Sequence, residues 1–248
     1  LIVGQTYALR LWVAPGSPYR DDDAVLAAIR WAREGGVPLL GSCGGLQYGV
    51  LEFMRTVLDA PATHAEVDGV SATNAIAPLP CSLRGEERLV TPVPGTWFDA
   101  MVGGRIAPGM HYCAYAPTPA TVDRLTSAGW LIEATAPDAG PEVLRLPTHP
   151  FYMLTLFQPQ IGASTAASLH PMLLSFVAAA RERSRRREMY AAAVGGEAAA
   201  RPAAYVHQQR WGARWWKPLV SIPLMIVLTF IAMMVVSFPF VMGGGITQ

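Results

Sequence analysis

Short apolar runs and amphipathic segments alternate over the first sixty residues. The apolar run at residues 9–14 ends at a Pro-Gly-Ser-Pro sequence, which predicts a buried strand followed by a tight loop. Three aspartates and apolar residues spaced by three and four then predict a helix over residues 23–34. A second strand is expected at residues 37–40, followed by a second amphipathic helix. This alternation is typical of an α/β fold with a largely parallel sheet.

The rest of the first 180 residues is less regular, being rich in Pro, Gly, Thr and Ala. Strand-like runs are predicted at residues 75–76, 88–90, 111–115 and 150–157. Apolar residues on one side of residues 171–181 predict a helix there. These segments are long enough together with the first ones to form one domain with a sizeable core.

The C-terminal part of the chain has a different pattern. Residues 218–242 contain no charged side chain, and about 20 apolar residues suffice to cross a bilayer as a helix. Arginines and tryptophans just before them combine the positive-inside signal with an interfacial aromatic belt. We therefore expect a domain over residues 1–184, a basic Ala/Gly-rich linker over 185–217 and a transmembrane helix over 218–242. The domain would be cytoplasmic and anchored to a membrane by this helix.

Composition and charge narrow the class of protein. The chain has 248 residues, of which 52% are hydrophobic, and a net charge of +1, which excludes a disordered chain and argues against a nucleic-acid partner. Residues 1–180 carry ten arginines against fifteen carboxylates, a net charge of −5. A basic cluster at residues 181–187 is best interpreted as lying against anionic lipid. Three cysteines are an odd number, which fits a reducing compartment rather than a disulfide framework.

The candidate chemistry centres on Cys43, which stands between a predicted strand and a predicted helix in the sequence Gly-Ser-Cys-Gly-Gly. Such a pattern predicts a nucleophile elbow, in which a sharp turn raises the side chain above the sheet. The positive end of the following helix would favour the thiolate. Backbone amides of the loop at residues 15–19 would face the same crevice and bind an oxyanion. Acyl transfer is the predicted chemistry; a buried structural cysteine is the alternative.

Several stretches, in the same order, resemble class I glutamine amidotransferases, and in particular the C-terminal glutaminase domain of CTP synthase. They are residues 15–17, 28–34, 37–47, 62–66, 157–160 and 170–171. The resemblance implies a three-layer α/β/α, flavodoxin-like fold, with its first strand and helix missing from this chain. It also implies hydrolysis of glutamine to glutamate and ammonia, with the ammonia passed to a synthetase domain or a partner in trans. No cofactor is implied.

The resemblance also assigns residues to the site. Cys43 is the nucleophile, the amides of Gly16 and Gly44 are oxyanion donors, and Gln47 and Glu66 hold the substrate glutamine. The expected substrate-binding residues are Gly16, Ser17, Gly44, Gly45, Gln47 and Glu66.

The same comparison of motifs exposes three departures. Where the family has His-Pro-Glu, this chain has Gln158-Pro159-Gln160, with Gln158 at the position of the proton-transferring His and Gln160 at the position of the Glu that stabilises the imidazolium. An amide transfers no proton at neutral pH, and losing general acid–base help costs a factor of about 10²–10⁴. Ser17 replaces a second glycine, and residues 110–115 replace a basic segment that grips the substrate carboxylate.

Two hypotheses follow from these departures. The first is weak glutamine hydrolysis or a related acyl transfer through Cys43, with Gln158 and Gln160 in the places of the triad partners. The alternative is a non-catalytic, membrane-anchored pseudoenzyme that binds a metabolite or a partner protein. A third alternative is that the segment from residue 205 begins a polytopic membrane protein.

Four histidines remain as candidates for other roles. His64, His111 and His149 fall in segments expected near the crevice, and each is either a structural histidine or a replacement base. His170 is expected to pack or to cap the last helix. No metal-ligand or phosphate-binding motif occurs in the sequence, so we expect no metal.

Overall fold

The computed structural model describes residues 10–161 and 169–194. The strands in this part of the chain are β1 (Leu11–Val13), β2 (Leu39–Ser42), β3 (Thr63–His64), β4 (Asn74–Pro78), β5 (Glu86–Pro92), β6 (Ala107–His111), β7 (Tyr115–Pro117), β8 (Leu131–Ala136), β9 (Gly140–Arg145) and β10 (Tyr152–Thr155). The helices are α1 (Asp22–Glu34), α2 (Gly44–Thr56), α3 (Ala65–Asp68), α4 (Trp97–Val102), α5 (Pro119–Ser127) and α6 (Pro171–Val194).

The main sheet has seven strands in the order β1-β2-β10-β9-β8-β5-β6. Strands β1, β2 and β10 are parallel, with Leu39 of β2 opposite both Leu11 and Tyr152. The remaining pairs are antiparallel. The parallel part therefore contains the two strands predicted near the N-terminus and the strand predicted at residues 150–157.

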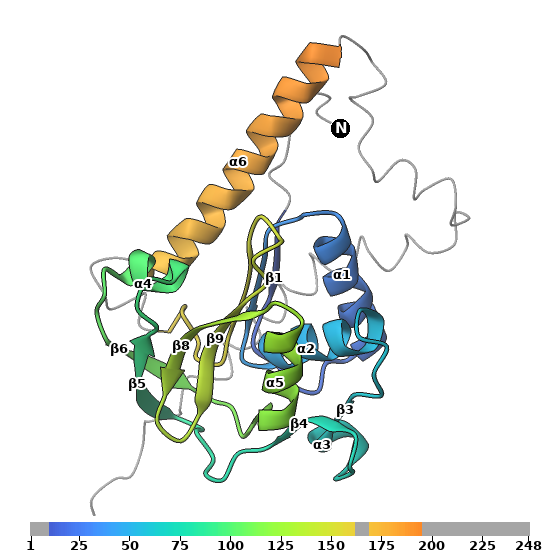
Figure 1. Ribbon diagram of the computed structural model, residues 1–248, viewed down its shortest axis with the longest axis vertical. Helices are drawn as coiled ribbons and strands as arrows, with labels where there is room; N and C mark the ends of the chain where they lie inside the picture. Colours follow the sequence, from blue (N-terminus) through green and yellow to red (C-terminus); the bar gives the residue numbers. More distant parts are fainter. Residues whose placement is uncertain (1–9, 162–168, 195–248) are drawn as a thin grey trace, which may run out of the picture. The chain divides into compact units, whose positions relative to one another are not determined.

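Helices cover both faces of this sheet, which gives three layers. Figure 1 shows α1, α2 and α5 on one side of the strands and α4 on the other. Successive residues of β2 divide between two apolar clusters, because side chains alternate along a strand. Leu39 packs with residues of α1, α2 and α5, whereas Leu40 packs with Phe98 of α4 and Phe176 of α6. The expected α/β class is confirmed by this arrangement.

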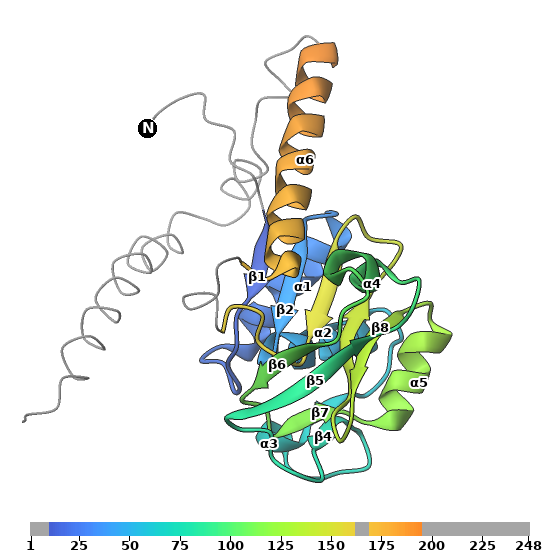
Figure 2. The same cartoon turned by 90° about the vertical axis from the view of Figure 1, so that its left-hand side faces the viewer.

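A smaller sheet of three strands, in the order β3-β4-β7, lies beside α3 (Figure 2). Strand β4 pairs in parallel with β3 and antiparallel with β7, where Ile76 faces Pro117. One contact between this sheet and α2 is made by Gln47, whose Nε2 donates to the carbonyl of Tyr115 in β7 at 2.8 Å. The smaller sheet thereby places residues 63–66 and 115 next to the N-terminal end of α2.

Most predicted elements are present, and one strand is wrong. Residues 111–115 were expected to form a strand, but Tyr112, Cys113 and Ala114 lie between β6 and β7. Here the chain leaves the main sheet and crosses to the smaller one, so no single strand can continue through. The last helix is longer than the expected residues 171–181, since α6 runs to Val194.

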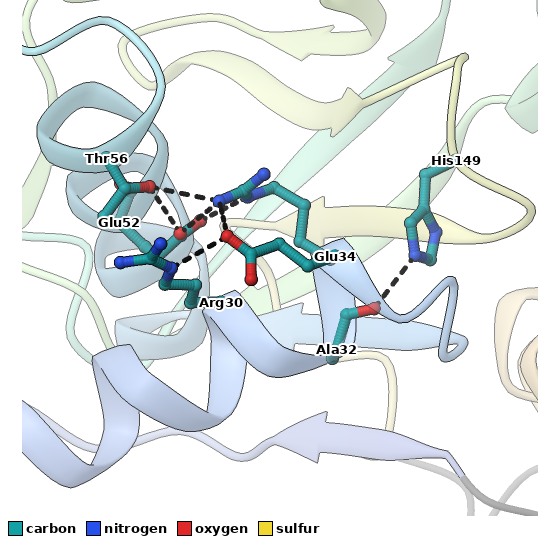
Figure 3. A network of polar contacts seen from close by, with 7 residues as sticks. Arg30, Ala32, Glu34, Glu52, Thr56 and His149 are labelled. Carbon is teal, nitrogen blue, oxygen red and sulfur yellow. Dashed lines mark hydrogen bonds and ion pairs between the residues drawn. The ribbon is translucent and has the colours of Figure 1, made fainter.

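A buried ion pair fixes α1 against α2. Arg33 donates through Nε and Nη2 to the two carboxylate oxygens of Glu52, at 2.9 and 2.8 Å, and the Glu52 side chain is only 1% exposed. The Thr56 hydroxyl also donates to this carboxylate (Figure 3). The contact with Glu52 raises the pKa of the Arg33 guanidinium. An exposed pair on α1, Arg30 with Glu34, lies alongside.

The predicted transmembrane segment at residues 218–242 lies outside the described residues. Within the part of the chain that the structure describes, no helix is both long enough and apolar enough to cross a bilayer.

Candidate functional site

The carboxyl ends of the three parallel strands converge on one region of the main sheet. Strand β1 leads into residues 14–17, β2 leads into Cys43, and β10 leads into residues 156–160. Crevices at the carboxyl edge of such a sheet are the usual binding region of α/β folds. The loop at residues 112–114 adds a fourth wall.

Cys43 occupies a sharp turn between β2 and α2. Its backbone lies in the left-handed region, with φ 54° and ψ −111°, which non-glycine residues rarely adopt. The Cys43 amide donates to the Thr155 carbonyl at 2.8 Å, and α2 begins at the next residue. A β-carbon on Gly44 would overlap the carbonyl of Gly16, and one on Gly45 would overlap the carbonyl of Val13. The predicted nucleophile elbow is therefore present, with its glycines required by close packing.

A cavity of about 240 Å³ opens beside Cys43. It is lined by Pro15, Gly16, Ser17, Cys43, Gln47, Glu66, Arg84, Tyr112, Cys113, Ala114, Tyr115 and Gln158. This volume suits a small metabolite and is too small for a macromolecular segment with its own fold. The structure thus brings together six sequence-predicted residues around one space; Gly44 and Gly45 form the packed floor behind it.

The surroundings of Cys43 favour the thiolate. Its pKa is lowered, first by the neighbouring side chain of Cys113 and further by the Gly44 amide, the Gln158 side chain and the charge of His111, against the opposing effect of burial. The pKa of Cys113 is correspondingly raised by its contact with Cys43 and by burial. The thiolate of Cys43 is therefore favoured over that of an ordinary cysteine, and the side chain of a second cysteine is the leading cause.

Gln158 and Gln160 form a hydrogen-bonded pair behind Cys43. The Gln160 amide Nε2 donates to Gln158 Oε1 at 2.9 Å, which leaves the Gln158 amide nitrogen to donate to Cys43. The arrangement orients Gln158 toward the sulfur, yet neither amide can accept or deliver a proton at neutral pH. The structure places Gln158 at the cavity beside Cys43 and Gln160 next to Gln158.

Glu66 of α3 and Gln47 of α2 both line the cavity. The Ser17 hydroxyl donates to the Glu66 carboxylate at 2.6 Å, which ties the loop after β1 to α3. The Gln47 carbonyl oxygen lies 3.0 Å from His64 Nε2, and its amide nitrogen donates to Tyr115. Gln47 is therefore held by its neighbours, while one of the two Glu66 carboxylate oxygens has no side-chain hydrogen bond among the described residues.

Two cavity residues have chemistry that was not identified from the sequence. Cys113, 2% exposed, belongs to the crossing segment between the two sheets, and Arg84 is an exposed residue before β5. Within the described residues, Arg84 forms no ion pair. Neither residue lies in a local sequence pattern that indicates a site. Each lines the same cavity as Cys43 only because the fold brings distant parts of the chain together.

The histidines occupy structural positions. His149 was expected near the crevice, and this is wrong, because its Nε2 lies 3.2 Å from the carbonyl of Ala32, near the end of α1 (Figure 3). His64 contacts Gln47 outside the cavity. His111 is buried against Glu142, with Nε2 within 3.0 Å of both carboxylate oxygens. His170 caps α6 by accepting from the Met172 amide and stacks on Phe98, as expected.

Metal-binding geometry is absent from residues 10–161 and 169–194, where no cluster of three or more His, Cys, Asp or Glu side chains could hold an ion.

Comparison with known proteins identifies the relatives of this domain. No family model matches the chain. In sequence, it is 32% identical over 179 residues to CTP synthase of Aeropyrum pernix, covering 67% of this chain and 33% of that protein. It is 31% identical over 189 residues to CTP synthase of Archaeoglobus fulgidus, covering 71% of this chain and 35% of that protein. The chain therefore spans about a third of the length of these relatives.

The fold points to the same relatives. The glutaminase domain of Trypanosoma brucei CTPS, solved with bound acivicin, superposes with a TM-score of 0.60 at 23% identity, covering 69% of this chain and 70% of that one. Together, sequence and fold show a glutamine amidotransferase-like domain related to the glutaminase domain of CTP synthase.

Proposed function

We propose that this domain binds glutamine and transfers its side-chain acyl group to Cys43, with slow release as glutamate. The observation on which the proposal rests is the position of Cys43 at a sharp turn that lines a cavity of about 240 Å³, where its surroundings lower the thiol pKa. Relatives named CTP synthase support the choice of glutamine chemistry.

The charges around the cavity suit an α-amino acid. Among the described residues that line it, two are charged, the carboxylate of Glu66 and the guanidinium of Arg84. A free amino acid has one ammonium and one carboxylate, so Glu66 would hold the first and Arg84 the second. Arg84 would then supply the cation that residues 110–115 lack.

The chemistry follows from the groups around the sulfur. The Cys43 thiolate attacks the side-chain amide carbon of glutamine, and the amides of Gly44 and Gly16 donate to the developing oxyanion. No backbone hydrogen bond within the described part of the chain occupies the Gly16 amide. Ammonia leaves with a proton taken from water, because the Gln158 amide is not acidic enough to supply one, and water then hydrolyses the thioester. Both steps are expected to be slow.

Mass spectrometry of the intact chain after incubation with glutamine tests this proposal. We expect a glutamyl adduct on Cys43 and slow ammonia release, both lost in Cys43→Ala and both kept in Cys81→Ser, which leaves Cys43 intact. The absence of adduct and ammonia in the unmodified chain would contradict acyl transfer.

A second candidate function is ligand binding without turnover, favoured by the Gln158–Gln160 pair. This pair fixes the side chain at Cys43 without providing a proton carrier. The domain would then report glutamine or a similar metabolite to a partner protein. Glutamine binding that is unchanged in Cys43→Ala, with no ammonia released by the unmodified chain, would support this second candidate over the first.

We also propose that any ammonia released by the domain passes to a synthetase in trans.

We further propose that residues 218–242 anchor the domain to a membrane. The support for the anchor is an uncharged apolar run preceded by arginines and tryptophans. Val227→Arg with Val235→Arg should move the full chain from an alkali-resistant membrane fraction to the soluble fraction, since each charge opposes insertion. Ala199→Arg, in the linker, is the matched control and should leave the distribution unchanged. Equal partitioning of all three chains would contradict the anchor.

A further inference from the structure

Two of the three cysteines face the same cavity. Cys43 and Cys113 both line it, whereas Cys81 is exposed elsewhere, and all three thiols are free. Acyl transfer uses Cys43 alone, so the chemistry of the second thiol is left open by the proposed function.

Consecutive residues at the end of β10 hold the two cysteines together. The backbone amide of Cys43 donates to the carbonyl of Thr155 at 2.8 Å, and the thiol of Cys113 lies 3.3 Å from the carbonyl of Leu156. The Cys113 carbonyl in turn accepts from the Leu83 amide at 3.0 Å, which fixes the crossing segment. With both residues anchored at one strand end and both lining the same cavity, the two thiols are neighbours, and each affects the pKa of the other.

We propose that Cys43 and Cys113 form a dithiol centre that exchanges with low-molecular-weight disulfides, such as oxidised glutathione, and closes an intramolecular disulfide across the cavity. The site differs from an acyl-transfer centre in its ligand class, and the proposal does not depend on glutamine being the substrate.

The exchange proceeds in two balanced steps. The Cys43 thiolate attacks one sulfur of oxidised glutathione, forms a Cys43–glutathione bond and releases one glutathione thiolate. Cys113 then loses its proton to a departing thiolate and attacks the Cys43 sulfur, which forms the Cys43–Cys113 bond and expels the second glutathione. The protein dithiol is oxidised by two electrons, and one glutathione disulfide is reduced to two thiols.

The contacts around the pair suit these roles. Cys43 is the attacking thiol because its thiolate is favoured and the cavity gives access to it. Cys113 is more deeply buried, at 2% exposure, and is the resolving thiol. Once Cys43 carries glutathione, its thiolate is gone, and with it the side-chain contact and the charge that, together with burial, raise the pKa of Cys113. Arg84 at the cavity would attract the carboxylates of glutathione.

Peptide mapping of the full chain decides the proposal. Cys81→Ser is used as the background so that no exposed thiol competes. After reduction, removal of the reductant and incubation with oxidised glutathione, we expect a chain lighter by two hydrogens, with no retained glutathione and with the Cys43 and Cys113 peptides linked. A dithiol reductant should reverse the change.

Cys113→Ser in the same background separates the two steps. It should retain one glutathione on Cys43, because no second thiol resolves the adduct, and circular dichroism checks that the variant is folded. The linked peptide in the background chain is measured without this variant, so the proposal is still tested if the variant fails to fold. A background chain that keeps glutathione on Cys43, or that does not react, would overturn the proposal.

Discussion

The ionisation of Cys43 depends on a few identified neighbours, of which Cys113 is the strongest. The lowered pKa means that the thiolate persists to more acidic pH than for an ordinary thiol, whose pKa is about 8.5. The rate of alkylation by iodoacetamide should therefore rise with pH to a plateau, and the midpoint of this rise should lie below that value. Cys113→Ala removes the side chain that lowers the pKa of Cys43 most, so the midpoint should move to higher pH and alkylation at neutral pH should slow. Cys81→Ser is the control; an unchanged midpoint in Cys113→Ala would refute the assigned cause.

Arg84 is the residue whose role in ligand binding is easiest to isolate. Its guanidinium lines the cavity without an ion-pair partner among the described residues. A hydrogen bond to a charged group contributes about 1.5–3 kcal/mol, so Arg84→Met should weaken glutamine binding by roughly 10- to 100-fold. Calorimetry in the Cys43→Ala background, which prevents turnover, measures this. Arg88→Met removes a nearby arginine that contacts Glu86 instead and should bind normally. Equal affinities for both variants would exclude Arg84 from the carboxylate site.

At the scale of elements, α2 is positioned by its ion pair with α1. Arg33→Met would leave the Glu52 carboxylate buried without its cation and should lower the free energy of unfolding by about 3 kcal/mol. Arg30→Met breaks only the exposed pair with Glu34, both partners being more than half exposed, and should cost less than about 1 kcal/mol. Urea denaturation of the two variants compares them directly. Similar losses for both would mean that burial of Glu52 does not determine the strength of this contact.

The elements around Cys43 were predictable because their signals are local. A carboxylate run starts α1, glycines surround Cys43, and apolar periodicity continues through α2. The segment at residues 111–115 was predicted wrongly because its apolar composition suits a strand, whereas the chain there crosses between two sheets. The contact of Cys43 with Cys113 links residues 70 positions apart. No spacing rule indicates such a contact, which depends on how the two sheets meet.

For the whole molecule, the two proposed functions share one scaffold and differ in whether the side chains at Cys43 can move protons. Both use the sharp turn at Cys43, the packed glycines and the cavity. Gln158 and Gln160 form a pair in which neither amide moves a proton, and Gln158 lowers the pKa of Cys43 through a side-chain hydrogen bond. Placing a histidine and a glutamate at these two positions tests whether the rest of the domain can still support catalysis.

Gln158→His with Gln160→Glu should raise glutamine hydrolysis by at least about tenfold. General acid–base catalysis typically raises a rate by a factor of about 10²–10⁴. We expect only part of this factor, because the side chains around the new imidazole have not been selected to orient it. The introduced imidazole would take the position of an amide already directed at Cys43, and the introduced carboxylate the position of the amide that now holds it. Ammonia release measures the gain, and adding Cys43→Ala should abolish it. If the double variant binds glutamine normally yet gains no activity, the cavity holds the ligand in a geometry unsuited to attack, and binding without turnover becomes the better description.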